Sequence, residues 1–153
     1  MCSTSNAEVH ALLEALDGSE SDQAYDARGR LRELLGDDLP NYLLARYRSQ
    51  RHWRRRTDYV YEALRYARRS EEAVNLGKLA VSDRSKMVRH RACALLAYSL
   101  RRDLLPFLEE ELAKAKDGET RDDIVAAMDA IVEQNHHYFV DRNHTGDWTW
   151  NVE

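Results

Sequence analysis

Apolar residues recur along most of this chain at intervals of three and four positions, the spacing that places side chains on one face of an α-helix. Segments of this kind run from about residue 5 to about residue 134, and short polar turns separate them. A clear example is the segment around 53–69, whose apolar stripe includes Val60 and Leu64. Each stripe covers one side of its helix only, so every predicted helix needs neighbours that bury it.

The lengths and ends of the segments indicate how the predicted helices are joined. Connections of two to four residues place consecutive helices antiparallel and side by side. Ser70 and Ser85 precede apolar segments and are expected to cap them, and Pro40 suits the first turn of another helix. The sequence therefore predicts a single all-α domain over residues 1–153, built as a stack of about four helix pairs, with a compact bundle as the alternative.

The last part of the chain has a different pattern. Residues 136–141 and 147–152 are rich in aromatic and β-branched side chains, and a turn-forming stretch that contains Gly146 separates them. This pattern predicts a C-terminal β-hairpin over about 136–152, with Gly146 at a positive φ angle. The two tryptophans of the second strand would share one face, which is expected to cover the open end of the stack.

A repeat-like pattern occupies the chain between Glu71 and Asn135. An apolar helix ends in the acidic residue Asp83. The next helix begins with the pair Val88-Arg89, which is followed by the apolar residues Ala92, Leu95 and Leu96. This segment resembles HEAT repeats, whereas residues 103–134 depart from the pattern, with Asp122-Asp123 near the place of the Val-Arg pair. The resemblance implies a HEAT-like α-α stack, an architecture that serves mainly as a binding surface.

The combination of a small HEAT-like domain with a terminal segment such as His136–Val152 is also similar to small bacterial immunity proteins. Proteins of that kind bind a partner toxin and neutralise it. This second resemblance implies that the chain is an immunity protein and that its partner is a cognate bacterial toxin.

Charge changes the picture because it is distributed in blocks. The formal net charge of the chain is −4. Residues 1–40 carry nine acids and three bases, residues 41–102 five acids and sixteen bases, and residues 103–153 thirteen acids and four bases. Because order along the chain becomes order in space in a helical stack, the fold is expected to hold one basic zone between two acidic zones.

Cysteine usage and the lengths of the apolar runs bear on the compartment. Cys2 and Cys93 are far apart, and two cysteines do not make a disulfide framework. The first residues lack the basic and apolar regions of a signal peptide, and no apolar run approaches the ~20 residues of a membrane span. These features predict a cytoplasmic protein that does not enter a membrane.

The densest basic cluster lies between residues 46 and 69, which hold nine arginines and two acids. Arginine beside aromatic side chains suits bidentate binding of carboxylates or phosphates and matches the composition of binding hot spots. The residues predicted to bind a partner are Arg46, Arg48, Arg51, His52, Trp53, Arg54, Arg55, Arg56 and Tyr59. The alternative interpretation is a solvated helix face whose charges pair with the acidic flanks.

Two kinds of partner suit this cluster. An acidic surface of a protein such as a toxin would be steered to it, and nucleic acid would be attracted through its phosphates. Because the acidic flanks would repel nucleic acid beyond the central zone, the favoured hypothesis is a non-catalytic protein-binding module. The alternative is a nucleic-acid-binding HEAT-like protein of the DNA-repair type that uses the basic central zone. The precedent is the HEAT-like DNA glycosylases, whose aromatic-and-carboxylate pocket has no recognisable motif in this sequence.

Metal and catalytic signatures are weak. The loop Asp141–Asp147 begins like an EF-hand calcium loop, but Val152 stands where a bidentate carboxylate is required, so the loop is interpreted as a turn. His136 and His137 would point to opposite faces of a strand, which disfavours a shared zinc site. The chain also lacks a phosphate-binding loop, a nucleophile elbow and a His-Glu-x-x-His motif. The sequence therefore predicts a protein without a cofactor and without enzymatic activity.

Overall fold

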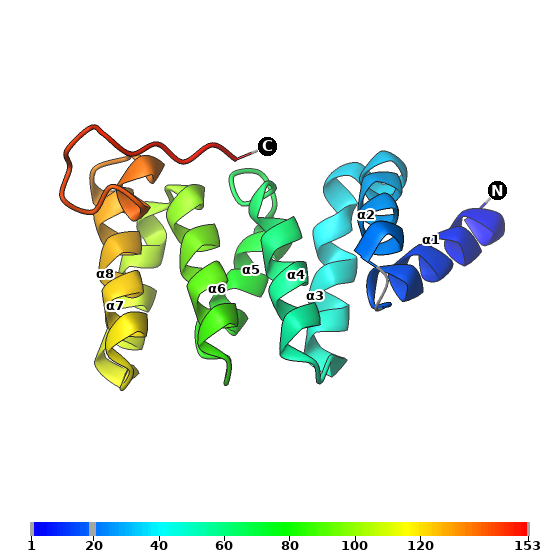
Figure 1. Cartoon of the computed structure of the whole chain (residues 1–153), viewed down its shortest axis with the longest axis horizontal. Helices are drawn as coiled ribbons and strands as arrows, with labels where there is room; N and C mark the ends of the chain where they lie inside the picture. The colour runs from blue at the N-terminus through cyan, green and yellow to red at the C-terminus, as the bar shows by residue number, and fades with distance from the viewer. Residues whose placement is uncertain (1, 19–20, 153) are drawn as a thin grey trace.

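The helices of this chain succeed one another along a single axis and form two layers, as Figure 1 shows for the computed structural model. The structure describes residues 2–18 and 21–152. Its α-helices are α1 (Cys2–Leu16), α2 (Ser21–Leu35), α3 (Leu39–Ser49), α4 (Trp53–Leu64), α5 (Glu71–Ala80), α6 (Lys86–Ser99), α7 (Leu105–Lys114) and α8 (Gly118–Val132). Three short 3-10 helices are η1 (Gly36–Asp38), η2 (Arg102–Leu104) and η3 (His136–Phe139). The predicted all-α class is confirmed.

The helices pack in successive antiparallel pairs. Within the pairs α1 contacts α2, α3 contacts α4, α5 contacts α6, and α7 contacts α8. Between the pairs α4, α6 and α8 pack side by side in one layer, and α3 packs on α5 in the layer behind it. The core lies between the layers, where side chains such as Leu76, Leu95 and Leu96 are fully buried. Apolar stripes on neighbouring helices thus cover one another.

The local end signals act largely as expected. The side chains of Ser70 and Ser85 accept hydrogen bonds from the backbone N–H groups of Ala73 and Val88, which caps α5 and α6. The segment predicted as one helix over about 53–69 ends earlier, at Leu64. Residues 65–69 form tight turns that still bury Tyr66 and Ala67. Because buried side chains continue at a helix-like spacing, the apolar pattern did not mark this end.

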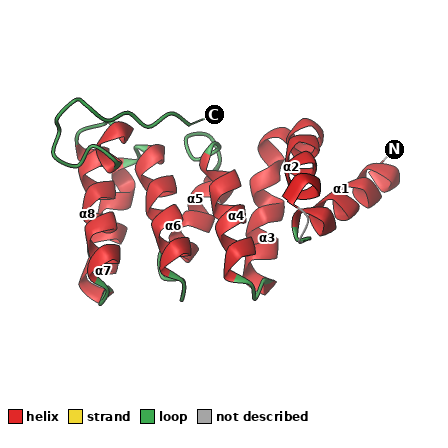
Figure 2. Ribbon diagram, in the orientation of Figure 1, coloured by secondary structure: helices red, strands yellow, loops and turns green. Residues whose placement is uncertain are grey.

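The predicted C-terminal β-hairpin is wrong. Figure 2 shows helices and loops but no strand in the described residues, and the first half of the segment forms η3. The side chain of Asn135 accepts a hydrogen bond from the backbone N–H of His137, which starts this 3-10 helix. Phe139 is the buried aromatic residue, whereas Trp148 is 66% exposed, so the expected alternation of buried and exposed side chains is absent.

Histidine side chains make the contacts that a strand ladder would have made. His136 Nε2 donates to the carbonyl oxygen of Trp150 at 2.9 Å, and the backbone N–H of Trp150 donates to His137 Nδ1 at 2.9 Å. Both backbone groups of Trp150 are therefore satisfied without a neighbouring strand. The segment after Phe139 crosses the ends of α8 and α6 as an extended tail (Figure 1). We call the two hydrogen bonds that join His136 and His137 to Trp150 the histidine clasp.

The turn within the tail has the chemistry that the sequence predicts. Gly146 has a φ angle of +80°, which is the expected positive value. The Asp141 carboxylate accepts hydrogen bonds from the backbone N–H groups of Thr145 and Gly146 and from the Thr145 hydroxyl. These bonds within the loop are the turn chemistry that the sequence indicates.

Helices α5 and α6 approach closely at Gly77. A Cβ atom at this position would lie 2.8 Å from Leu95 Cδ2 and 3.0 Å from Leu96 Cδ2. Contacts this short force buried leucines to move, and protein cores resist such movement. Gly29 in α2 is different, because a Cβ atom there would meet nothing within 4 Å.

Gly77→Val is therefore expected to lower the free energy of unfolding by about 1–3 kcal/mol through overpacking. Urea denaturation followed by circular dichroism measures this change. Gly29→Ala is the matched control and is expected to raise the free energy of unfolding by about 0.5–1 kcal/mol, because alanine favours the helix over glycine. An unchanged denaturation midpoint for Gly77→Val would show that α5 and α6 do not need this close approach.

Within residues 2–18 and 21–152, the structure contains no helix that is both long enough and apolar enough to cross a membrane.

Candidate functional site

The nine residues predicted to bind a partner lie in the end of α3, the turn that follows it, and the first turns of α4. Their side chains fall into two groups. Four are held by contacts within the protein: Arg46, Arg55, Arg56 and Tyr59. Five are exposed: Arg48, Arg51, His52, Trp53 and Arg54. The cluster is thus partly a structural element and partly an open surface.

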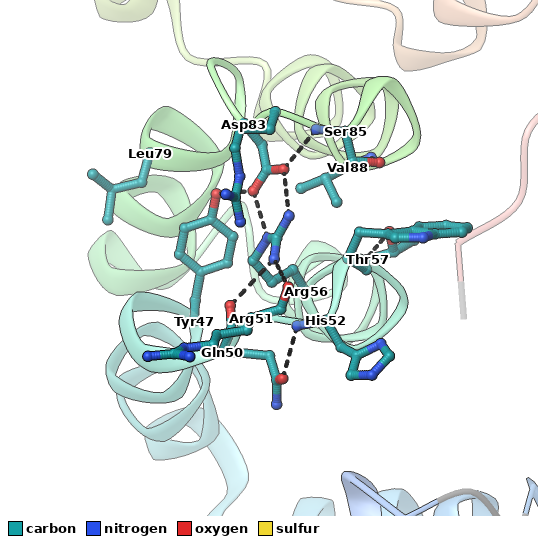
Figure 3. A network of polar contacts seen from close by, with 12 residues as sticks. Tyr47, Gln50, Arg51, His52, Arg56, Thr57, Leu79, Asp83, Ser85 and Val88 are labelled. Carbon is teal, nitrogen blue, oxygen red and sulfur yellow. Dashed lines mark hydrogen bonds and ion pairs between the residues drawn. The ribbon is translucent and has the colours of Figure 1, made fainter.

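Arg56 is the centre of a buried polar network, shown in Figure 3. Its Nε donates to Asp83 Oδ2 at 2.8 Å and its Nη2 donates to Asp83 Oδ1 at 3.0 Å, which makes a bidentate ion pair. Its Nη1 donates to the carbonyl oxygens of Gln50 and Arg51 at 3.2 and 2.7 Å. Arg56 therefore joins the turn before α4 to the turn before α6.

Burial and hydrogen bonding act in opposite directions on Asp83. Burial by itself would raise the pKa of the Asp83 carboxyl, but hydrogen bonds from Arg56 and Tyr47 outweigh it, so the pKa is lowered. The Tyr47 hydroxyl donates to Asp83 Oδ2 at 2.6 Å. Burial and this carboxylate raise the pKa of Tyr47. Asp83 is thus held as an anion that orients both of its partners.

Asp17, at the end of α1, is the centre of a second network. It accepts hydrogen bonds from Arg46 Nε at 3.1 Å and from the hydroxyl of Tyr59, and its backbone carbonyl accepts from Arg55 Nε at 2.7 Å. Tyr59 is fully buried, and burial together with Asp17 raises its pKa to about 12. Gln50 Nε2 completes the network by donating to the Tyr59 hydroxyl. Three predicted binding residues therefore connect α1 to α3 and α4.

The other five residues form the exposed basic edge, which we define as Arg48, Arg51, His52, Trp53 and Arg54. None of its three arginine side chains has a carboxylate partner among the described residues. Trp53 is 41% exposed, and the Arg54 guanidinium carbon lies 5.4 Å from the centroid of its ring. In Figure 3, Arg51 and His52 project away from the Asp83 network. Free cations and an aromatic ring thus meet at one end of the helices.

Elsewhere, the acidic flanks fold back onto the basic middle of the chain. Three arginines of the segment 41–102 bind acids from the flanks, in the pairs Arg46–Asp17, Arg69–Asp37 and Arg101–Asp103. Lys86 and Arg89 also lie within 4 Å of Glu119 and Asp117. Much of the positive charge of the middle segment is therefore compensated inside the molecule.

The structural role of Arg56 could have been recognised from the sequence, because an arginine recurs at the same helix position. Arginine occupies the fourth residue after the N-cap in α4, α6 and α8, at positions 56, 89 and 121. Each of these guanidinium groups donates to two backbone carbonyl oxygens. The acceptors lie in the turn before the arginine's own helix or in the last turn of the preceding helix. Arg56 and Arg89 also approach the acid of the following turn, Asp83 and Asp117. An arginine that recurs in this way indicates a structural role rather than partner binding.

A separate cavity of about 360 Å³ lies at the other end of α4. Residues from α4, the following turn, α6 and the tail line it: Tyr61, Leu64, Arg65, His90, Arg91, Ala94, Phe139, Val140, Trp150, Asn151 and Val152. The sequence did not predict this cavity, because the tail was expected to form strands. In the described residues, no group of three or more histidine, cysteine, aspartate or glutamate side chains is placed to hold a metal ion.

Comparison with known proteins adds no relative to this description. Searches against protein-family models, curated proteins and solved structures found no match to the chain. The inferences about function therefore draw on no matched relative.

Proposed function

We propose that this protein is a non-catalytic binding module that holds an acidic surface of a protein partner against its exposed basic edge. The observation that carries the proposal is that Arg48, Arg51 and Arg54 are exposed without a carboxylate partner in the described chain, beside a half-exposed Trp53. Arginine and tryptophan are the residue types that most often anchor protein interfaces. Unpaired guanidinium groups would also steer an acidic partner toward this edge.

The buried network beneath this edge supports the proposal. Arg56 holds the carbonyl oxygens of Gln50 and Arg51, and Asp83 holds Arg56. The turn that presents Arg51 and His52 is therefore fixed before a partner arrives. Preorganisation of this kind reduces the conformational entropy that is lost on binding.

The resemblances to HEAT repeats and to small immunity proteins give the proposal its most specific form. In that form the partner is a bacterial toxin, and occupation of its acidic surface neutralises it. We infer the cytoplasm as the compartment, because the buried free thiol of Cys93 suits reducing conditions.

The distribution of ion pairs favours a protein partner over nucleic acid. A duplex needs a continuous basic surface that meets several phosphates. Arg46, Arg56, Arg69 and Arg101 are each bound to acids of this chain, which interrupts such a surface and leaves the exposed basic edge as one separate group of free cations. An acidic patch on a protein can match a small cationic edge of this kind.

The test begins with identification of the partner. A photo-crosslinking amino acid at position 53, in the cells that make the protein, is expected to capture an acidic protein. In purified form, Arg51→Glu together with Arg54→Glu should then weaken binding of that partner at least tenfold, because attraction becomes repulsion across the interface. The helical circular dichroism signal should stay unchanged, since neither side chain takes part in the buried networks.

Arg102→Glu is the matched control, because Arg102 is exposed at the opposite end of the helices and is expected to leave affinity unchanged. Full affinity in the double variant would remove the exposed basic edge from the interaction. A mobility-shift titration with duplex DNA separates the alternative function. Retention near physiological ionic strength that weakens as salt is raised would favour nucleic-acid binding instead.

A further inference from the structure

We propose that the cavity between α4, α6 and the tail binds a small molecule with a planar aromatic group and a single carboxylate or phosphate. The cavity volume of about 360 Å³ lies within the range of small-molecule sites in proteins. Its described lining holds two arginines and no carboxylate. An anion is therefore the charged ligand that this lining would accept.

The Arg91 guanidinium group is free to bind an anion. Its guanidinium carbon lies 4.4 Å from the centroid of the Tyr61 ring, and its side chain makes no hydrogen bond or ion pair with the described residues. The ring orients the guanidinium group but does not neutralise it. Arg91 can thus offer its N–H groups to an anion in the cavity in a bidentate arrangement.

Arg65 supplies the second cation. Its Nε is enclosed and has no hydrogen-bond partner in the described structure, although Glu62 Oε1 lies 3.8 Å away. Glu62 is fully engaged with Arg32, to which both carboxylate oxygens are hydrogen-bonded. An enclosed donor without a partner is unfavourable, and a shift of the Arg65 side chain that brings this N–H to an anion in the cavity would relieve the cost.

The remaining walls suit a flat apolar group. Tyr61, Phe139 and Trp150 line the cavity, and Phe139 and Trp150 pack with their ring centroids 5.7 Å apart. His90, also in the lining, lies 3.0 Å from the Asp123 carboxylate, which holds it against the ring of Phe139. Aromatic side chains favour offset or edge-on contact with another ring.

This cavity is distinct from the exposed basic edge. Trp53 begins α4 and Leu64 ends it, so the two sites are about 16 Å apart along the helix. The tail forms one wall of the cavity and takes no part in the basic edge. The two proposals can therefore be tested independently.

The test is a calorimetric titration of the full chain with 1-naphthoate and with its uncharged analogue 1-naphthamide. Naphthoate is expected to bind with one-to-one stoichiometry, and naphthamide at least tenfold more weakly, because it lacks the charge that the arginines recognise. Arg91→Gln should weaken naphthoate binding at least tenfold and leave naphthamide binding unchanged. Its folding is expected to be normal, since Arg91 belongs to no ion pair in the described structure.

Arg102→Gln is the matched control, since it removes an exposed arginine outside the cavity, and it should bind naphthoate like the wild type. The double variant of Arg51 and Arg54 should also bind naphthoate normally. Equal affinity for naphthoate and naphthamide, undiminished naphthoate affinity in Arg91→Gln, or no binding of naphthoate at millimolar concentration would each overturn the proposal. None of these outcomes bears on the exposed basic edge.

Discussion

Asp83→Ala is expected to lower the free energy of unfolding by about 3–5 kcal/mol, the typical cost of removing one partner from a buried ion pair. The substitution leaves the Arg56 guanidinium buried without its carboxylate, since the two side chains are only 7% and 5% exposed. It also removes the acceptor of the Tyr47 hydroxyl. Urea denaturation followed by circular dichroism measures the loss.

The control is Asp37→Ala, which removes the carboxylate from the exposed pair with Arg69. An exposed ion pair contributes about 0–1 kcal/mol, so this variant should remain close to the wild type. Equal stability of the two variants would mean that the Arg56–Asp83 pair does not connect the helix pairs. Replacing Arg56 as well is expected to restore little, because Arg56 also holds the carbonyl oxygens of Gln50 and Arg51.

Acid should weaken the same network. Hydrogen bonds from Arg56 and Tyr47 overcome the effect of burial and lower the pKa of Asp83 below its ordinary value of 3.8. As the pH falls, the unfolded chain therefore binds the proton first, and the contribution of Asp83 is lost from about pH 4 downward. In Asp83→Ala this part of the acid sensitivity should be absent.

The second large effect is expected in the tail. Replacing both His136 and His137 with alanine removes both hydrogen bonds of the histidine clasp to Trp150. Each such bond contributes about 1 kcal/mol, so the local free energy of opening should fall by about 2 kcal/mol. That change corresponds to about thirtyfold faster hydrogen exchange at the backbone N–H of Trp150, which NMR measures.

Mild acid should also make the clasp less stable. His136 Nε2 donates to Trp150 while its Nδ1 accepts a hydrogen bond from Arg68, so the ring is neutral in the folded protein. Burial and the nearby charges of His137 and Arg68 lower the pKa of His136 below 6.5. The stabilisation is thus complete above about pH 6.5 and is lost as the pH falls through the folded pKa.

His144 provides a comparison of opposite sign in the same tail. Its hydrogen bond with Asp129 raises its pKa, so its contribution to stability is complete below about pH 6.5 and is lost as the pH rises through the folded pKa.

His10→Ala is the control for the double variant of His136 and His137, because His10 is exposed on α1, far from the tail. Unchanged exchange at Trp150 in the double variant would refute the histidine clasp.

The sequence by itself determined the helices and their order. Their apolar stripes, the serine caps of α5 and α6, and the short turns are local signals, and the same signals operate in the folded chain. The blocks of charge were equally visible in the sequence. The apolar periodicity gave the wrong structure in two places. At residues 65–69 burial continues beyond the end of a helix, and in the segment from His136 to Val152 histidine side chains replace the backbone pairing of a hairpin.

Tertiary structure decided what each charged side chain does. Consecutive residues such as Arg54, Arg55 and Arg56 look alike in the sequence, yet one is exposed, one binds a backbone carbonyl and one is buried with Asp83. The difference arises because neighbouring positions on a helix point in different directions and meet different elements. The cavity beneath the tail depends on the same kind of long-range contact. Local pattern therefore specified the helices, whereas contacts between distant segments determined which arginines remain free to bind a partner.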